Sequence, residues 1–454
     1  MPQDLFTVER DFEHGEKPAI GVIVANLGTP EAPTAKALRP YLRQFLGDPR
    51  VVEFNRPLWW LILNGPILTF RPKKSAEVYA NVWTEKGSPL LVSSNRLTEM
   101  IEERLQARFG TPVHCELAMT YGEPSTPGAL QKLKDKGCRR IVVLPLYPQY
   151  SGSTVGSVFD AITKELRTWR WVPEMRTINQ YHDDPAFIDA LAGRVRKFWD
   201  EHGEPQMLVT SYHGIPKRYF LNGDPYHCQC HKTTRLLADR LGLSEDRYLV
   251  TFQSLFGREE WLKPYTEDTL EAMPEAGIKS LDVICPGFAV DCLETTDEID
   301  REYREVFEEA GGEQFRYIGC LNEGDDHADV LADLVASNLQ GWAQEPREFD
   351  AAAVDDESEE SHRLAAARAG CPIFADAGFG EKAHDSIAPE STETPEPSAA
   401  PEPSAAPEAS AAPEAQIAPE ASVDPDAPEQ AAARNLLRPS LLRTLLRPAG
   451  FLKT

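Results

Sequence analysis

The chain has 454 residues, more than one hydrophobic core usually holds, which predicts two domains plus additional segments. Its formal net charge of −25 at pH 7 argues against nucleic acid as a partner, because phosphate binding needs a basic face. The charge is uneven: residues 345–430 have a net charge of −17 (21 acidic and 4 basic side chains), residues 431–454 have +5, and −13 remains on residues 1–344.

The eight cysteines form no regularly spaced set of the kind that indicates a disulfide framework, and the first residues lack the pattern of a signal peptide. We therefore expect a reducing, cytoplasmic setting. No apolar stretch reaches the ~18–20 residues that are needed to cross a bilayer. The nearest, residues 58–63, stops at Asn64-Gly65-Pro66, so we predict a segment that can lie at a surface but cannot span.

Apolar runs of strand length alternate with amphipathic segments of helical period over about 330 residues, which is typical of an α/β fold with a mostly parallel sheet. Because the pattern runs twice, we predict two Rossmann-like domains, residues 18–180 and 181–344, with a ligand cleft between them at the strand ends. The predicted strands are residues 20–25, 115–119, 140–144, 207–210, 248–252 and 281–284, and the clearest predicted helices are residues 97–109, 185–201 and 233–241.

The composition changes at about Glu345. Residues 345–430 are acidic and rich in Pro, Ala and Glu, with too little apolar surface to offset the entropy of ordering, so we predict a disordered tail. In residues 431–454, Leu pairs alternate with Arg, and Pro439 and Pro448 would break one long helix. This basic amphipathic segment can rest on an anionic membrane or can be an unstructured end, and the sequence favours neither alternative.

A histidine comes just after one predicted strand. His213 stands in Ser-Tyr-His-Gly-Ile-Pro (residues 211–216), directly after the apolar run at 207–210. The Gly and Pro that follow indicate a turn, and a turn at the carboxyl end of a strand faces the predicted cleft. A single histidine is more often a structural residue than a catalyst, so this observation needs a second one beside it.

Acidic side chains follow the strand at 281–284. In a helix that starts near Asp291, Glu294, Glu298 and Glu302 recur every four residues and would form a carboxylate ladder about 12 Å long on one face. A solvated acidic face is the commoner explanation of such a run. However, like charges four residues apart repel each other, and no basic residue interleaves before Arg301. The clustering therefore favours a ladder that handles cations or protons.

Several long motifs, in the same order along the chain, resemble the ferrochelatases, especially those of Gram-negative bacteria. They are NLGTPEAPTAKALRPYLRQFLGDPRVV, GSPL, LPLYPQYSGSTVGS, SYHGIP, GDPYHCQCHKTTRLLADRLGL, TFQSLFGREEWLKPYTEDTL and CPGFAVDCLETTDEI. The resemblance covers about residues 18–343. It implies the class II chelatase arrangement, in which two Rossmann-like domains with parallel four-stranded sheets enclose a porphyrin cleft. It also implies insertion of Fe²⁺ into protoporphyrin IX, the last step of haem biosynthesis.

The resemblance implies roles for single residues. His213 matches the family's metal-side, proton-abstracting histidine, and Glu294 matches its partner across the macrocycle. Glu298 and Glu302 match the carboxylates that conduct protons or metal. The chemistry agrees, because imidazole titrates near neutrality and suits a base for a pyrrole proton, and imidazole and carboxylate both bind Fe²⁺. Which of His213 and Glu294 abstracts the protons, and which admits the metal, stays open.

Three further residues match the family's porphyrin contacts: Arg71, Tyr79 and Ser88. The spacing from Tyr79 to Ser88 is longer than in some animal members, which makes Ser88 the weakest match. The Trp- and Leu-rich residues 58–70 would suit a lip at the cleft mouth for an apolar planar substrate that arrives from, or leaves to, a membrane. Packing of a helix into the core is the alternative. We accordingly expect a cytoplasmic protein that contacts the inner membrane peripherally, through this lip or the C-terminal segment.

Some family members carry a [2Fe–2S] cluster held by four cysteines. Here Gly152 stands at the first ligand position, and Cys371 is the only cysteine beyond Cys320, so we expect neither this cluster nor another tightly bound cofactor, and Fe²⁺ is the substrate. The run from His227 to His231 (His-Cys-Gln-Cys-His) is too tight for all four side chains to meet one tetrahedral ion. We interpret it mainly as a structural or loop feature, with a regulatory metal site as the alternative.

Two other functions agree with much of this pattern. A chelatase for coproporphyrin or for cobalt would share the fold and the pair formed by His213 and Glu294. A non-catalytic porphyrin carrier would bind the macrocycle but would tolerate the loss of His213.

Overall fold

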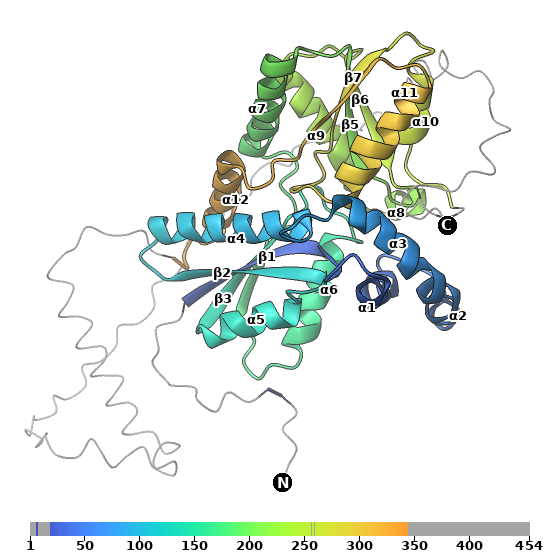
Figure 1. Ribbon diagram of the computed structural model, residues 1–454. Coiled ribbons are helices and arrows are strands. Elements are labelled where there is room, and N and C mark those ends of the chain that lie inside the picture. Colours follow the sequence, from blue (N-terminus) through green and yellow to red (C-terminus); the bar gives the residue numbers. More distant parts are fainter. Residues whose placement is uncertain (1–5, 8–18, 256, 258, 344–454) are drawn as a thin grey trace, which may run out of the picture. The chain divides into compact units, whose positions relative to one another are not determined.

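The computed structural model describes residues 6–7, 19–255, 257 and 259–343 (Figure 1). The predicted acidic tail (345–430) and the basic C-terminal segment (431–454) lie outside the described residues. The described residues contain two four-stranded sheets, each covered by helices on both faces (Figure 1). No helix in this part of the chain is both long and apolar enough to pass through a bilayer.

The first sheet has the strand order β2-β1-β3-β4, and all its neighbouring strands pair in parallel. Its central strand is an almost continuous apolar run whose side chains from Val22 to Ala25 are at most 1% exposed, as expected for a parallel strand that is buried on both faces. The strands are β1 (Ala19–Thr29), β2 (Val113–Gly122), β3 (Cys138–Pro145) and β4 (Glu174–Thr177).

The second sheet repeats this arrangement with the order β6-β5-β7-β8, again with parallel pairing throughout. Its strands are β5 (Met207–His213), β6 (Tyr248–Gln253), β7 (Ser280–Ile284) and β8 (Gln314–Ile318). The prediction of an α/β fold with two parallel four-stranded sheets is confirmed. The six predicted strands are present, and the sequence missed two of the four edge strands, β4 and β8, because neither contains a continuous apolar run.

The helices fill the connections. In the first half these are α1 (Ala35–Gly47), α2 (Arg56–Ile62), the π-helix η1 (Leu63–Ile67), α3 (Leu68–Val82), α4 (Pro89–Arg108), α5 (Thr126–Asp135) and α6 (Val155–Leu166). In the second half they are α7 (Pro185–His202), α8 (Lys217–Leu221), α9 (Tyr226–Leu241), α10 (Thr266–Ala272), the π-helix η2 (Glu294–Tyr303), α11 (Arg304–Glu309) and α12 (Asp325–Ser337). The predicted helices lie in α4, α7 and α9, and the first of them runs one residue past the end of α4 at Arg108.

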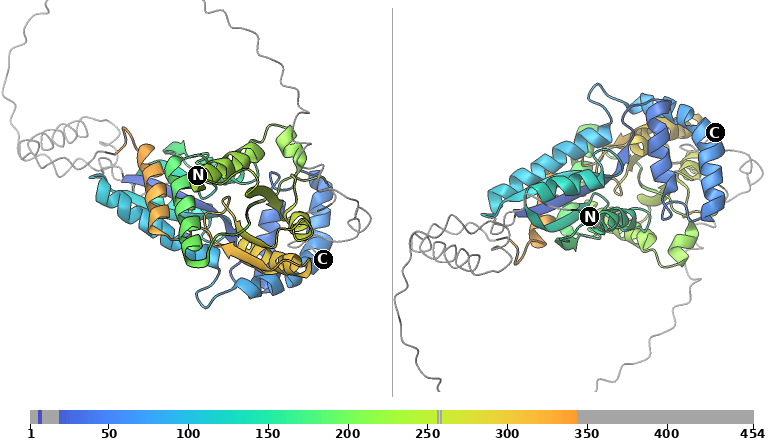
Figure 2. Two further views of the ribbon diagram at one scale, coloured as in Figure 1. Left: turned by 90° about the horizontal axis from the view of Figure 1, so that it is seen from above. Right: turned by 90° about the horizontal axis from the view of Figure 1, so that it is seen from below.

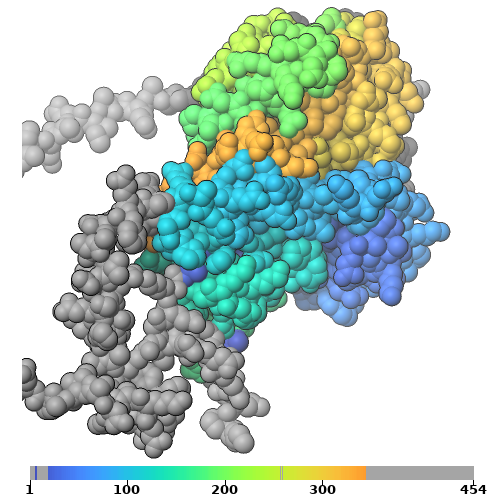
Figure 3. Space-filling model, turned by 60° about the vertical axis from the view of Figure 1, so that its left-hand side comes forward, coloured from blue at the N-terminus to red at the C-terminus, as the bar shows by residue number. Residues whose placement is uncertain are grey.

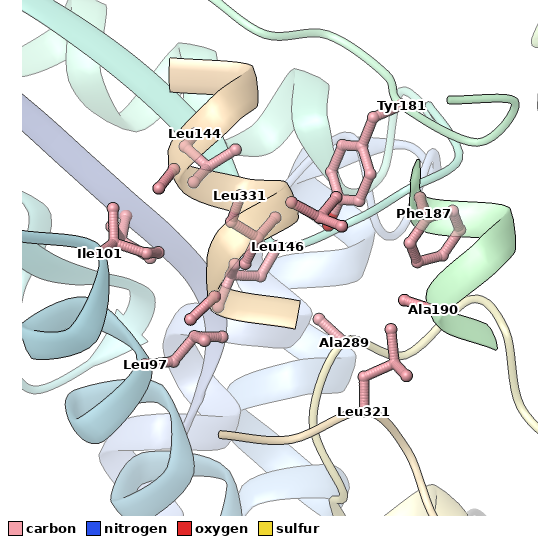
Figure 4. Packing of buried hydrophobic residues seen from close by; sticks show 14 of the residues in the cluster. Leu97, Ile101, Leu144, Leu146, Tyr181, Phe187, Ala190, Ala289, Leu321 and Leu331 are labelled. Atoms are coloured by element: carbon pink, nitrogen blue, oxygen red, sulfur yellow. The ribbon is translucent and has the colours of Figure 1, made fainter. Parts of the chain in front are cut away.

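The last helix, α12, joins the two halves. It packs against α4 and α7, between which it lies in all the views (Figures 1, 2 and 3). Leu331 of α12 lies in one buried cluster with Leu97 and Ile101 of α4, Leu144 of β3 and residues of the second half, such as Phe187 (Figure 4). The two sheets therefore share a hydrophobic core, and the described residues from 19 to 343 fall in one compact unit.

Candidate active site

His213 is the last residue of β5. Its ring is partly exposed, and Nδ1 lies 2.6 Å from the carbonyl oxygen of Gly214. A carbonyl oxygen only accepts hydrogen bonds, so Nδ1 carries the proton of the neutral ring and Nε2 keeps its lone pair. Gly214 leaves no room for a side chain, because a Cβ atom there would lie 2.8 Å from the carbonyl oxygen of Gln253. The tight turn thus holds the imidazole with Nε2 ready to accept a proton or bind a metal.

Glu294 is the first residue of η2 and is 8% exposed. Its main-chain carbonyl accepts a hydrogen bond of 2.8 Å from Nε2 of Gln253. Gln253 is also the neighbour of His213 in the β5–β6 ladder, and its own carbonyl accepts a hydrogen bond of 2.8 Å from the amide of Gly214. One residue at the end of β6 therefore connects the strand that carries His213, through its main chain, with the helix that carries Glu294, through its side chain.

Glu298 is buried within hydrogen-bonding distance of four donors. The main-chain amide of Ser254 (2.9 Å) and the Tyr303 hydroxyl (2.7 Å) donate to Oε1, while the Ser254 hydroxyl (2.6 Å) and Nε2 of Gln253 (3.4 Å) donate to Oε2. Burial opposes ionisation more strongly than these donors favour it, and raises the pKa of Glu298 from 4.5 to about 7. This carboxyl can therefore exchange a proton near neutral pH.

The acidic segment differs in helix type from the predicted α-helix. Residues Glu294–Tyr303 form a π-helix, which suits the hydrogen bond from Tyr303 to Glu298, five residues earlier. The hydroxyls of Thr295 and Thr296 both donate to the carbonyl of Cys292, so side chains also bond to the main chain at the start of the helix. Acidic residues that recur every four positions do not reveal these contacts. Because π-helices are rare, an α-helix is the ordinary expectation for such a pattern.

The three carboxylates predicted to bind metal or conduct protons, Glu294, Glu298 and Glu302, have different surroundings. Glu294 and Glu298 are buried, whereas the side chain of Glu302 is 34% exposed and forms an ion pair with Arg301 (3.1 Å between Oε1 and Nη2). Arg301 also pairs with the buried Asp297 (2.7 Å between Nε and Oδ1), so its positive charge offsets the negative charges of both Asp297 and Glu302. The acidic face thus runs from two buried carboxyls to one at the surface.

Of the three predicted porphyrin contacts, the structure brings Tyr79 close to the carboxylates. Tyr79 on α3 is buried and hydrogen-bonded to Tyr41 of α1, and the nearby charge of Glu294 adds to the effect of burial in raising the pKa of both tyrosines. Asn81 of the same helix donates to Asp297 of η2 (3.1 Å), which ties α3 to the acidic segment.

Arg71 lies on α3, eight residues before Tyr79, and burial lowers the pKa of its guanidinium to about 10. Ser88 is buried and is the N-cap residue of α4. Arg71 and Tyr79 thus share one helix, whereas Ser88 begins the next.

The sequence analysis missed Gln253, Ser254 and Tyr303 as site residues. Gln253 and Ser254 directly follow the predicted strand at 248–252, and they stand in the motif TFQS, so the reasoning that found His213 at a strand end could have found them. Ser254 has a positive φ of 64°, which aims both its amide and its hydroxyl at Glu298. Tyr303 gave no signal of its own, because its role depends on the π-helix.

The segment from residue 58 to 70 contains both buried and exposed apolar side chains. Trp59, Leu63 and Leu68 are buried in a hydrophobic cluster, as expected if this face of the segment packs into the core. Four other large side chains project outward, with exposures of 48% for Leu58, 63% for Trp60, 61% for Leu61 and 72% for Phe70. The predicted break at Pro66 is instead a π-helical turn, η1, through which α2 continues into α3.

The run from His227 to His231 lies in the first turns of α9, so the loop alternative for it is wrong. Cys228 is exposed, Cys230 is buried, and the rings of His227 and His231 lie next to each other. In the part of the chain that the structure describes, no group of three or more His, Cys, Asp and Glu side chains is placed to hold a metal ion.

Comparison with known proteins gives a uniform result. A family model described as Ferrochelatase matches residues 19–339. The ferrochelatase of Thioalkalivibrio sulfidiphilus is 56% identical over 360 residues, which are 79% of this chain and 98% of that protein. The ferrochelatases of Marinobacter nauticus and Idiomarina loihiensis are also 56% identical; their matches cover 73% and 74% of this chain and 90% and 92% of those proteins.

Proposed function

The chain belongs to the ferrochelatase family, whose members insert Fe²⁺ into protoporphyrin IX to form protohaem, and on this premise we propose that His213 and Glu294 carry the reaction. The observation that supports this proposal is Gln253, which hydrogen-bonds to the carbonyl of Glu294 and pairs with His213 in the β-ladder. A base and a carboxylate on two elements that one residue links suit a reaction that removes protons while a metal enters.

Two pyrrole N–H protons must leave the macrocycle before its four nitrogens can bind Fe²⁺. His213 accepts one of these protons at Nε2, because Nδ1 is committed to the carbonyl of Gly214. Fe²⁺ is the substrate, and the Nε2 atom of His213 and the carboxylate of Glu294 are ligands that can hold it briefly on its way into the ring.

Protons then leave through the acidic face of η2. Glu298 is placed to relay them, because its pKa of about 7 allows it to be protonated and deprotonated at neutral pH. Glu302 is partly exposed and so delivers them to solvent. The same carboxylates can conduct Fe²⁺ inward. Arg71, Tyr79 and Ser88 bind the porphyrin, with the cationic Arg71 suited to a propionate group.

The first prediction concerns the two central residues. Replacement of His213 by Ala, or of Glu294 by Gln, should abolish haem formation from protoporphyrin IX and Fe²⁺ under anaerobic conditions, because the base or the coupled ligand is lost. Porphyrin binding, measured by quenching of intrinsic fluorescence, should be retained. His202→Ala, which removes an exposed histidine of α7, is the matched control and should leave the rate unchanged.

Full activity of the His213→Ala variant would contradict the proposal, and a wild type that binds porphyrin without metallating it would instead be a carrier. Parallel assays with coproporphyrin and with Co²⁺ would show whether protoporphyrin IX and Fe²⁺ are the preferred pair.

A second proposal concerns the membrane. We infer that the four exposed apolar side chains of residues 58–70 form a lip that rests on the surface of a bilayer, from which protoporphyrin arrives or into which haem leaves. Exposed basic residues lie next to the lip, at Arg56, Lys73 and Lys74, where they would face anionic headgroups. The protein would then be cytoplasmic and peripheral at the inner membrane.

Replacement of both Trp60 and Phe70 by Glu should therefore reduce co-sedimentation with vesicles that contain anionic lipid, since it puts two charges into the apolar contact. The control is Phe159→Glu, which changes an exposed aromatic residue of α6, with an exposure of 51%, outside the lip. Equal binding by all three proteins would rule out the lip as the membrane contact. Activity with detergent-dispersed porphyrin should be unaffected by any of these changes.

A further inference from the structure

The two histidines of the run from residue 227 to 231 are not used by the proposed reaction. They lie four residues apart on α9, which places them one above the other on the same face of the helix. Their ring centroids are 4.5 Å apart, with an angle of 47° between the ring planes. The two rings are therefore in direct contact.

This separation matches two imidazoles bound to one metal ion. A metal ion about 2.0–2.1 Å from an imidazole nitrogen lies about 3.2 Å from the ring centroid. Two rings that meet such an ion at an angle between about 90° and 110° then have centroids about 4.5–5.2 Å apart. The observed 4.5 Å falls at the lower end of this range, so the spacing of the two rings is compatible with chelation of one ion.

One nitrogen of the pair lacks a partner. The Nε2 atom of His231 is buried and makes no hydrogen bond within the described residues. A buried polar atom without a hydrogen bond is unfavourable, and a bond to a metal ion would satisfy it. The surroundings are aromatic, because the His227 ring stacks on Phe252 (5.7 Å between centroids, 18° between planes) and also packs against Phe220.

The cysteines between the histidines do not complete the site. Cys230 is fully buried and hydrogen-bonded to Tyr226, and Cys228, which is exposed, comes directly after His227 and so projects about 100° around the helix from it. The donor set is thus two neutral imidazole nitrogens, with water at the open positions. Imidazole ligands suit Cu²⁺, Zn²⁺ and Ni²⁺, and among these Cu²⁺ binds most tightly to a given site of nitrogen donors.

We propose that His227 and His231 form a second metal site, separate from the one that handles the substrate, which binds a late first-row divalent ion through two imidazole nitrogens. Because His227 stacks on Phe252, and Phe252 directly precedes Gln253 in β6, an ion bound here braces α9 against the strand that supports the active site. Its effect should appear as stabilisation of the fold, since an ion that binds only the folded chain raises the free energy of unfolding.

The test uses the full chain with His213→Ala, so that the substrate site contributes no imidazole. One equivalent of Cu²⁺ should give an electron paramagnetic resonance spectrum with coupling to two nitrogens. The added substitution His227→Gln or His231→Gln should reduce this to one nitrogen, and the double variant should show none. Calorimetric titration with Zn²⁺ should show affinity lowered more than about tenfold in the double variant, because even second-shell changes cost about 10–100-fold.

Two matched controls have defined outcomes. Cys228→Ser should leave the spectrum and the affinity unchanged, because the thiol is not a ligand, and His202→Gln should do the same as an exposed histidine elsewhere. The proposal is overturned if the double variant binds Zn²⁺ within twofold of its parent, or if the parent spectrum shows no nitrogen coupling. Circular dichroism of each variant confirms that a lost signal is not a lost fold.

Discussion

Glu298 is the most constrained side chain of the site at the scale of single residues. It is 3% exposed and within reach of four hydrogen-bond donors, which would normally keep a carboxylate ionised. Burial outweighs them, because transfer of a charge from water into the protein interior costs more than the donors return. The result is a carboxyl that changes its protonation state at the pH at which the enzyme has to release protons.

This balance predicts how stability changes with pH. Between the ordinary pKa of 4.5 and the folded value of about 7, the folded state binds more protons at Glu298 than the unfolded state. The contribution of Glu298 to the free energy of unfolding is therefore fully present below pH 4.5 and is lost as the pH rises through about 7. We expect the free energy of unfolding of the wild type to fall, relative to Glu298→Gln, by up to roughly 3 kcal/mol across that interval.

Urea unfolding of both proteins at a series of pH values measures this difference, and all other titrating groups cancel in it. The same substitution at Glu103, which is 63% exposed on α4, provides the reference curve. A difference that stays constant with pH, or that rises with it, would show that Glu298 is not protonated in the folded protein near neutrality.

At the scale of elements, the winding of η2 determines which side chains can hydrogen-bond to its carboxylates and main chain. Its π-helical winding lets Tyr303 reach back five residues to Glu298, while Thr295 and Thr296 bond to the main chain at its start. Asp291, just before the helix, accepts from the Tyr317 hydroxyl of β8 (2.6 Å) and from Nδ2 of Asn322 (2.7 Å). Contacts from neighbouring elements thus hold an otherwise unfavourable helix in place.

Replacement of Tyr303 by Phe should weaken the relay without changing porphyrin binding. The loss of one donor raises the pKa of Glu298 further, so the acidic limb of the kcat profile should move to higher pH by about one unit, given that a hydrogen bond to a charged group contributes about 1.5–3 kcal/mol. The KM for porphyrin should stay the same. Steady-state rates between pH 5 and 9 measure both quantities.

The matched control for this prediction is Tyr181→Phe, which removes a buried hydroxyl that makes no hydrogen bond within the described residues. An acidic limb that does not move in Tyr303→Phe, or that moves equally in both variants, would contradict a specific role for Tyr303.

At the scale of the whole molecule, the two sheets depend on α12. This helix comes from the end of the second half but packs on α4 of the first, and Arg104 and Arg108 of α4 form ion pairs with Asp325 (2.9 Å) and Asp333 (2.8 Å) of α12. The predicted boundary at residue 180 therefore separates two sheets that share one hydrophobic core.

A pair of truncations tests this dependence. A chain that ends after residue 348 should keep its haem-forming activity, because all the described residues and the family match are retained. A chain that ends after residue 324 should fail to fold. The buried side chains that it loses include Val330, Leu331 and Val335, which contribute about 1.5–3 kcal/mol each against a total stability of about 5–15 kcal/mol.

Circular dichroism and anaerobic haem formation measure both chains. As a control, Leu331→Ala in the longer chain should cost about 2–5 kcal/mol and still give a cooperative unfolding transition. A folded, active chain that ends at residue 324 would show that α12 is dispensable.

Much of the fold could be predicted because its signals are local. Strands such as β1 and β5 are apolar runs of strand length, and burial on both faces requires such runs in a parallel sheet. The edge strands β4 and β8 could not be predicted, because they are short and partly exposed and mix polar with apolar residues, as Glu-Met-Arg-Thr does in β4. The other two edge strands, β2 and β6, were predicted from their apolar segments.

The sequence by itself determined where His213 stands, because a strand end and the turn after it are encoded by adjacent residues. It also determined the spacing of the acidic side chains from Glu294 to Glu302. Only the tertiary structure decided that Gln253 bridges the two, that Tyr303 bonds to Glu298, and that the helix between them is a π-helix. Those features depend on side chains that meet through packing across distant parts of the chain, and no local pattern records such contacts.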